Sequence, residues 1–136
     1  MTTPYQERNI ADPAMNVGDE PYFAAAAEGR LLVKKCADCG EIHHYPRSAC
    51  PFCLSDRVAW QDAKGTGKIY SYSITRRAGP IPYCIAYVTL DEGVTMLTNI
   101  VDCDLDKVKI GQVVKVAFKK STGGVSVPMF TPLEPV

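Results

Sequence analysis

Two closely spaced pairs of cysteines constrain the fold of this chain more than any other feature. The first pair, Cys36 and Cys39, has two residues between its members. The second pair, Cys50 and Cys53, repeats that spacing after a gap of ten residues. The spacing lets both sulfur atoms of a pair point at one centre, and four thiolates in a tetrahedron suit zinc. Because four cysteines leave no position for water or substrate, we expect one structural zinc ion.

Iron is the main alternative metal for this pattern. The two pairs also resemble the knuckles of rubredoxin, an electron carrier, but rubredoxins are shorter and have a longer gap between their pairs. His43 and His44 lie in the gap, and one of them could replace a cysteine as a ligand. With four cysteines available, we expect the histidines to be exposed at a loop tip or to stack on Tyr45.

Composition indicates an ordinary globular protein. The 136 residues suffice for one domain of usual size or for two very small ones. Fifteen basic and fifteen acidic residues cancel, which disfavours binding to a nucleic-acid backbone. No apolar run approaches the roughly 20 residues that a membrane-spanning helix needs, and the polar start carries no export signal. We therefore expect a cytoplasmic protein, in which six cysteines argue for metal or thiol chemistry rather than disulfides.

The first of three predicted regions, residues 1–30, is a leader with one candidate helix. Asp19 can cap the helix, Pro21 falls in its first turn, and a glycine ends it. A helix of about ten residues is marginal alone in water. Tyr22 and Phe23 must therefore pack on a surface, which is either the core of this chain or a partner.

The other two regions are the cysteine-rich residues 31–62 and a strand-rich part, residues 63–136. The strand-rich part contains five candidate strands: Lys68–Arg76, Tyr83–Leu90, Val94–Asp102, Val113–Lys119 and a short last strand after Gly123-Gly124. Asp91-Glu92-Gly93 is the strongest hairpin signal, and Pro128 confines the last strand to an edge or an end. Five strands in about 70 residues leave no room for crossover helices, which predicts a small barrel.

Two basic pairs at predicted strand ends are candidate contacts to phosphates. Arg76 and Arg77 follow one strand, and Lys119 and Lys120 end another. Charge-assisted hydrogen bonds from such pairs can hold phosphate oxygens. The alternative is that all four side chains are solvated strand ends.

An alternating aromatic strand allows two interpretations. Tyr70, Tyr72 and Ile74 fall on one face of an ideal strand. They could form a platform for stacking bases, but such a face more often belongs to the core, and we expect core.

The sequence contains no recognisable set of catalytic groups. Cys84 and Cys103 stand alone along the sequence, and we expect both to be buried small hydrophobic residues. The only histidines lie between the cysteine pairs. A nucleophile needs a base or an electropositive setting, so we expect no self-sufficient active site in this chain.

The order of these parts resembles one bacterial and archaeal family. The segments that carry the resemblance are YFAAAAEGRLLVKKCADCG, CPFC, GKIYSYSITRR, PYCIAYVTLDEGVTMLTNIVDCD, VKIGQVVKVAFKK and VPMFTP. That family combines a rubredoxin-like zinc ribbon with an OB-fold and was long described as a domain of unknown function. The resemblance covers roughly residues 18–133. It implies a mainly β fold, with a short helix, a zinc ribbon over 31–62 and a five-stranded OB barrel over 63–136.

The resemblance also implies a function. Members are typically small subunits of acyl-CoA enzymes, whose partners are thiolase-like proteins, related acyltransferases and aldolases, or hot-dog hydratases. The catalytic residues belong to the larger partner, which the small subunit buttresses while it helps to cover or bind the CoA moiety. We therefore expect a subunit of a complex that makes or breaks carbon–carbon bonds in acyl-CoA, with a thiolase-like partner and the four basic residues near the CoA phosphates. A single-stranded nucleic-acid binder is the alternative, because OB barrels and zinc ribbons both occur in that role.

Overall fold

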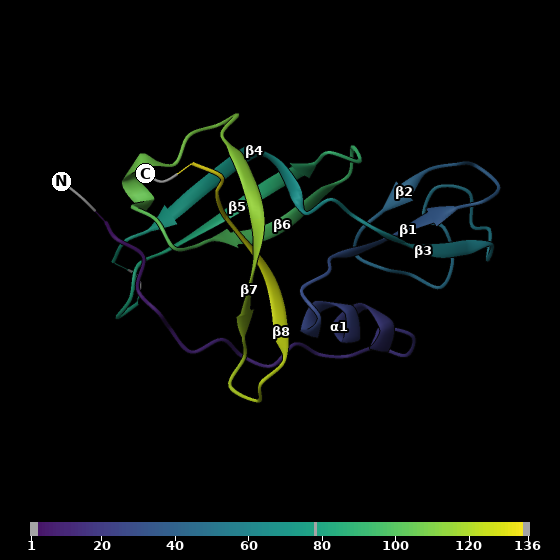
Figure 1. Ribbon diagram of the computed structural model, residues 1–136, viewed down its shortest axis with the longest axis horizontal. Helices are drawn as coiled ribbons and strands as arrows, with labels where there is room; N and C mark the ends of the chain where they lie inside the picture. The colour runs from purple at the N-terminus through teal and green to yellow at the C-terminus, as the bar shows by residue number, and fades with distance from the viewer. Residues whose placement is uncertain (1–2, 78, 135–136) are drawn as a thin grey trace.

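The computed structural model describes residues 3–77 and 79–134 (Figure 1). These residues form two separate β-structures, a three-stranded sheet and a closed barrel, together with one short α-helix. The elements are α1 (Glu20–Ala27), β1 (Leu32–Cys36), β2 (Ile42–His43), β3 (Val58–Asp62), β4 (Thr66–Thr75), β5 (Tyr83–Leu90), β6 (Thr95–Ile100), the 3-10 helix η1 (Leu105–Lys107), β7 (Val113–Lys120) and β8 (Ser126–Pro132). The predicted mainly β class is confirmed. Within the described residues, no helix has the length and apolar character to span a membrane.

The small sheet has the order β2-β1-β3, with β1 antiparallel to both neighbours. Lys34 at the centre of β1 lies opposite His43 of β2 on one side and Trp60 of β3 on the other. The first cysteine pair begins at Cys36, the last residue of β1, and the second pair lies in the connection between β2 and β3. One small sheet therefore brings both pairs to the same end.

The barrel has the order β4-β5-β6-β8-β7, which confirms the predicted five-stranded barrel. β8 pairs along its length with β7, but it pairs in parallel with β6 only at Ile100 and Phe130. The carbonyl of Pro128 accepts from the Thr98 hydroxyl of β6 at 3.2 Å. The N–H and C=O of a strand residue point to the same side of the strand. The nitrogen of Pro128, which carries no hydrogen, therefore faces the sparsely bonded seam with β6, so the β7–β8 ladder loses no hydrogen bond.

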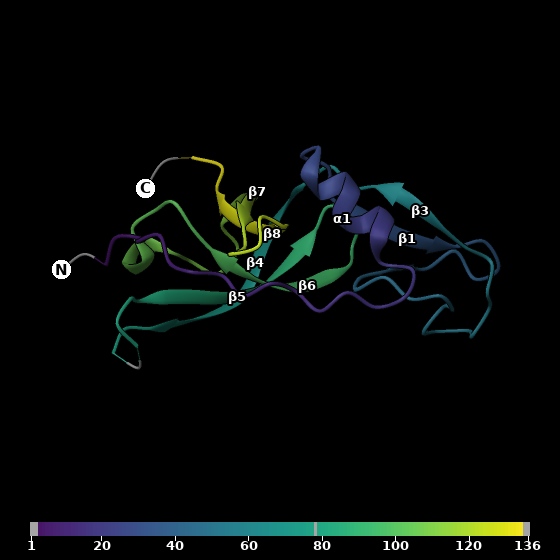
Figure 2. The ribbon, with the colours of Figure 1, turned by 90° about the horizontal axis from the view of Figure 1, so that it is seen from below.

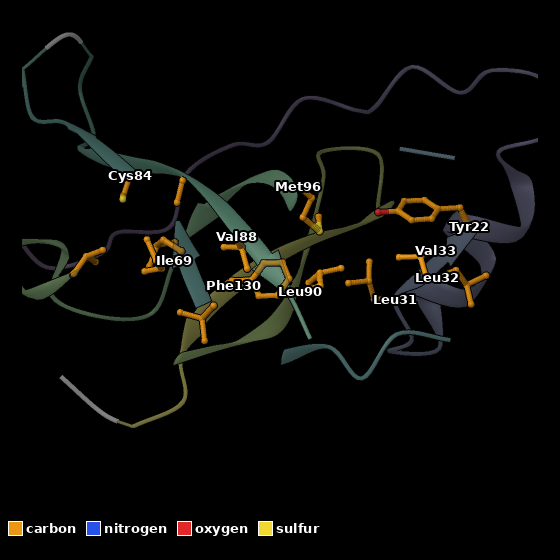
Figure 3. Close-up of a cluster of buried hydrophobic side chains, with 14 of the residues drawn as sticks. Tyr22, Leu31, Leu32, Val33, Ile69, Cys84, Val88, Leu90, Met96 and Phe130 are labelled. Atoms are coloured by element: carbon orange, nitrogen blue, oxygen red, sulfur yellow. The ribbon is translucent and has the colours of Figure 1, made fainter. Parts of the chain in front are cut away.

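One hydrophobic core runs through both β-structures (Figure 3). Ile69, Val88 and Phe130 fill the barrel, and the core continues to Leu32 and Tyr22 in the ribbon and helix. Tyr22 and Phe23 thus pack on this chain's own core, and α1 lies against β1 and β8 (Figure 2). Each such side chain contributes roughly 1.5–3 kcal/mol through burial, which stabilises a helix too short to persist alone.

The start of α1 differs from the expectation in one detail. Asp19 occupies the N-cap position, but its side chain makes no capping hydrogen bond to the helix. Its buried carboxylate instead accepts from the Asn16 N–H at 3.0 Å and from the Tyr45 hydroxyl at 2.8 Å. The residue therefore ties the helix to the loop between the cysteine pairs.

Residues 3–12, the N-terminal strap, run along the barrel before the chain reaches α1 (Figure 1). The N–H of Tyr5 donates to the Cys103 carbonyl at 2.9 Å, and the N–H of Thr122 donates to the Ile10 carbonyl at 2.9 Å. At the end of the strap, the Asp12 carboxylate accepts from the N–H of Gly123 at 2.7 Å. The strap joins the segment after β6 to the β7–β8 turn.

Candidate metal centre and flanking surfaces

Four thiols meet at the end of the small sheet. The Sγ atoms of Cys36, Cys39, Cys50 and Cys53 all lie within 4.8 Å of one another. Two of the separations, Cys36 to Cys53 and Cys39 to Cys50, are 3.6 Å. Zn–S bonds of about 2.3 Å at tetrahedral angles place sulfur atoms roughly 3.8 Å apart. The four cysteines are thus positioned to bind one zinc ion.

The electrostatics of the four thiols also suit a cation. The N–H of Cys39 points at the Cys36 sulfur and, with that of Asp38, lowers the pKa of Cys36 to about 7. The N–H of Glu41 acts the same way on Cys39, but desolvation and the neighbouring sulfurs prevail and raise its pKa to about 12. Four thiols this close cannot all ionise unless a positive charge lies between them. Zinc supplies that charge and holds all four as thiolates.

The two cysteine knuckles have the same backbone turn. The N–H of Gly40 donates to the Cys36 carbonyl at 3.0 Å, and the N–H of Leu54 donates to the Cys50 carbonyl at 2.9 Å. Both turn residues have positive φ, +78° for Gly40 and +67° for Leu54. Glycine adopts this conformation without strain, whereas leucine does not. Leu54 is also 81% exposed, so burial does not offset that strain.

The two histidines lie outside the thiol cluster. Neither is exposed at a loop tip, but His44 packs against Tyr45, the other expected position. His43 is buried because β2 pairs with β1, and its Nε2 accepts from the Arg47 N–H at 3.3 Å. His44 is half-buried, with its Nε2 2.8 Å from the Tyr22 hydroxyl and its ring edge-on to Tyr45. Burial lowers the pKa of His44 to about 4. His44 thus connects the ribbon to α1, His43 makes its contacts within the ribbon, and neither belongs to the thiol cluster.

Two of the four basic residues predicted to contact phosphates already form ion pairs with carboxylates. Arg76 lies 2.6 Å from Asp106, and Lys119 lies 2.8 Å from Asp102. Lys119 also pairs with Glu7 of the strap at 3.0 Å. Arg76 and Lys119 thereby contact opposite ends of one connector, residues 102–106. A phosphate would have to compete with these carboxylates.

The other two basic residues are more available to bind a phosphate. Arg77 and Lys120 are exposed, and neither forms an ion pair within the described residues. Their role as phosphate contacts stays a prediction.

Of the lone thiols, Cys84 is buried as expected, whereas Cys103 is only half-buried. Burial raises the pKa of each to about 11, which leaves both as unreactive thiols.

The expectation that the aromatic residues of β4 form core is wrong. Tyr70 is 69% exposed and Tyr72 is 39% exposed. A β-bulge lies between Ile69 and Ser71, so Tyr70 has no partner of its own and Tyr70 and Ser71 together oppose Tyr87. In a bulge, two residues point to the side of the one they oppose, so Tyr70 lies on the outer side of the barrel.

After the bulge, the two tyrosines no longer share a face. Tyr72 pairs with the buried Ala86 and therefore lies on the inner side of β4. Pairing of β4 with β7 ends at Lys68, so no strand covers Tyr72 there. Sequence alternation alone missed this because the bulge becomes visible only when β4 is aligned with β5.

The outer side of the barrel carries an uncharged, partly apolar surface. We call it the outer barrel face and define it by Tyr70, Ser71, Ser73, Ile85, Tyr87, Leu97 and Asn99. A shallow hollow of about 140 Å³ lies over this face, lined in part by Ile85, Tyr87 and Leu97. It offers hydroxyl groups and apolar surface, without an acid, a base or a metal ligand.

Two family models match the chain, one for each β-structure. The ChsH2 rubredoxin-like zinc ribbon domain matches residues 23–59, and the ChsH2 C-terminal OB-fold domain matches residues 60–119.

Curated relatives include proteins of two kinds. A probable enoyl-CoA hydratase alpha subunit of Thermomonospora curvata is 35% identical over 127 residues, which cover 90% of this chain and 40% of that subunit. This chain therefore spans less than half of that relative. A DUF35 domain-containing scaffold protein of Methanothermobacter thermautotrophicus is 35% identical over 96 residues, 66% of this chain and 72% of the scaffold protein.

Solved structures give the same fold. A chain of the Ltp2-ChsH2(DUF35) aldolase superimposes with a TM-score of 0.78 at 34% identity, covering 90% of this chain and 100% of that one. A DUF35 protein of unknown function from Sulfolobus solfataricus superimposes with a TM-score of 0.63 at 18% identity, over 87% of each chain.

Proposed function

This chain belongs to the DUF35 family of ChsH2-like zinc-ribbon and OB-fold proteins, and from that premise we propose that it is a scaffold subunit of an acyl-CoA enzyme complex. The observation that carries the proposal is the match over the whole length of the ChsH2 chain in an aldolase complex. The second support is the relative whose name describes an enoyl-CoA hydratase subunit, in which the matched part makes up 40% of the chain. Both names describe an enzyme of which this fold is one part.

The division of labour follows from the chemistry of the chain. The four clustered thiols are positioned to bind a zinc ion, which would occupy all of them, and burial raises the pKa values of Cys84 and Cys103. We propose that the catalytic groups come from the partner and that this chain supports and partly covers the partner's site. A cover excludes water and strengthens the electrostatic interactions beneath it.

The finer proposal names the partner and the ligand. We propose a thiolase-like catalytic subunit that cleaves or forms a carbon–carbon bond in an acyl-CoA; the aldolase named in the similar structure supports the carbon–carbon chemistry. Arg77 and Lys120 are the first candidates for the CoA phosphates, since their charges are not paired within the described residues. Arg76 and Lys119 become further candidates if the phosphates displace their present carboxylate partners. These partners are Asp106 for Arg76, and Asp102 and Glu7 for Lys119.

Co-purification tests the proposal. The native chain is isolated from its source under mild conditions, its companions are identified by mass spectrometry, and the complex is rebuilt from purified parts. We expect a thiolase-like or hydratase subunit, and acyl-CoA turnover only when it is present. Turnover by the highly purified chain alone, or a stable complex that lacks any acyl-CoA enzyme, contradicts the proposal.

A second candidate function has one observation in its favour. Tyr70 and Tyr87 are exposed on the barrel strands, where OB-folds bind single-stranded nucleic acid. Zero net charge and the uncharged outer barrel face weigh against it. Binding of an oligothymidylate that weakens steeply with salt would favour this function over the scaffold.

A further inference from the structure

We propose that the outer barrel face is the surface on which the catalytic subunit docks. The inference rests on the proposed function and adds the place of contact and its chemistry. The partner's surface should be apolar and uncharged at its centre, with backbone or hydroxyl groups around it. Three features of the face support this: its continuity, its size and its lack of charge.

The pairing of the strands makes the face continuous. Tyr87 of β5 lies opposite Leu97 of β6 on one side and Ser71 of β4 on the other. Ile85, two residues earlier on β5, lies opposite Ser73 and Asn99 in the same way. Directly opposite residues have Cβ atoms about 4.5–5.5 Å apart, so these side chains form one surface across three strands.

Tyr70 of β4 extends the apolar part of that surface. Tyr70 joins Ser71 opposite Tyr87 and is 69% exposed, the highest value on the face. Alternation from the buried Ile69 places Tyr70 on the outer side, and the bulge turns Ser71 to the same side instead of inward. Bulges commonly re-aim a side chain next to a functional site.

The size of the face favours a larger partner over a second copy. Tyr70, Ile85, Tyr87 and Leu97 are between 40% and 69% exposed. At roughly 100 Å² each, they present about 400 Å² of apolar surface, typical of the largest functional patch on a monomer. Two copies joined through this surface would bury about 800 Å² in total, which is the range of weak packing contacts. A partner that also covers the rim reaches the roughly 800 Å² per side of a stable complex.

The chemistry of the face favours protein over nucleic acid. No charged residue occurs in residues 69–75, 83–90 or 95–100, which are the strand segments beneath the face. The exposed Lys68 lies opposite Thr89 at the border of the face, and Arg76 and Arg77 follow the end of β4, so a phosphate backbone would find cations only at the rim. Exposed tyrosines with aliphatic neighbours and no charge are the composition of interface centres, and the hollow beside Tyr87 offers space for one anchoring side chain.

A pair of leucine variants tests the inference with the rebuilt complex. Leu97→Asp places a charge on the face directly opposite Tyr87, and Leu54→Asp makes the same change on the ribbon knuckle, at a residue that is also exposed. Affinity for the catalytic subunit identified by co-purification is measured by isothermal titration calorimetry. We expect at least a hundredfold loss for Leu97→Asp and less than a twofold change for Leu54→Asp. Circular dichroism and zinc content confirm that both variants are folded.

Neutral variants keep the test valid if Leu97→Asp does not fold. Tyr70→Ser removes the most exposed ring of the face, and Tyr87→Ser removes the ring at its centre, in both cases without adding charge. We expect at least a tenfold loss of affinity for each. Wild-type affinity in both neutral variants, or an equal loss in Leu54→Asp and Leu97→Asp, overturns the inference while leaving the scaffold function intact.

Failure of the proposed function gives a different result. In that case the wild-type chain itself binds no acyl-CoA enzyme subunit, before any variant is compared. Sedimentation of the chain alone and titration with an oligothymidylate then identify the occupant of the face. A dimer lost in Leu97→Asp assigns the face to a second copy, oligothymidylate binding lost in Tyr70→Ser assigns it to nucleic acid, and either result overturns the inference.

Discussion

Acid should destabilise this protein through one histidine. His44 is enclosed by Tyr22 and Tyr45, and its Nε2 lies 2.8 Å from the Tyr22 hydroxyl. Burial lowers its pKa from 6.5 to about 4 in the folded state. The unfolded chain therefore binds the proton more readily, and stability is fully present above pH 6.5 and falls as the pH drops towards 4. The full difference of 2.5 units corresponds to about 3 kcal/mol, of which about 2 kcal/mol is already lost at pH 5.

His44→Gln isolates this effect from other acid-sensitive groups. Glutamine cannot gain a proton, but its carbonyl still accepts from the Tyr22 hydroxyl. Release of zinc by acid and the lowered pKa of His43 affect both proteins equally, so they cancel in the comparison. Urea unfolding of both proteins at pH 7.5, 6.5, 5.5 and 4.5 gives the free energies of unfolding. We expect the variant to be about 1 kcal/mol less stable at pH 7.5 and more stable than the wild type below about pH 5.5. Parallel pH profiles would refute the reasoning.

Four further predictions follow from other parts of the molecule. Metal analysis should find one equivalent of zinc, and chelation or Cys39→Ser should unfold the ribbon by circular dichroism; bound iron would contradict this. Leu54→Gly should raise the free energy of unfolding by roughly 1 kcal/mol in urea, because it relieves a positive φ at an exposed side chain; an unchanged or lower value would be evidence against strain. In the rebuilt complex, Arg77→Ala and Lys120→Ala should raise KM for acyl-CoA about tenfold with kcat unchanged, and an unchanged KM would leave these residues without a CoA role. Asp12→Ala should speed amide exchange in the N-terminal strap, whereas exchange at the wild-type rate would mean that the strap is held elsewhere.

Features set by local spacing could be predicted from the sequence. The cysteine pairs come together because each Cys-x-x-Cys knuckle closes on itself, with Gly40 in the required turn. The β5–β6 hairpin was predictable for the same reason, since Gly93 supplies the positive φ of its turn. Neither inference needed the position of a distant strand.

Features set by distant contacts could not be predicted. The burial of His43 depends on the pairing of β2 with β1, and the placement of Tyr70 and Tyr72 on opposite sides depends on the bulge in the register of β4 against β5. Glu7 reaches Lys119 across 112 positions of sequence. No local pattern marks such partners, so the basic residues could be nominated as phosphate contacts, but their carboxylate partners could not be foreseen.

The position of α1 gives the metal an influence beyond the ribbon. Tyr22 contacts His44, Tyr45 and Trp60 of the ribbon, while the same helix packs on β8 of the barrel. A chain that lacks its ion loses the ribbon that holds Tyr22, and the apolar side of the helix then becomes accessible to proteases and chaperones. Cells that are short of zinc would therefore remove empty copies by ordinary protein quality control, and the pool available for assembly would consist of metal-loaded chains.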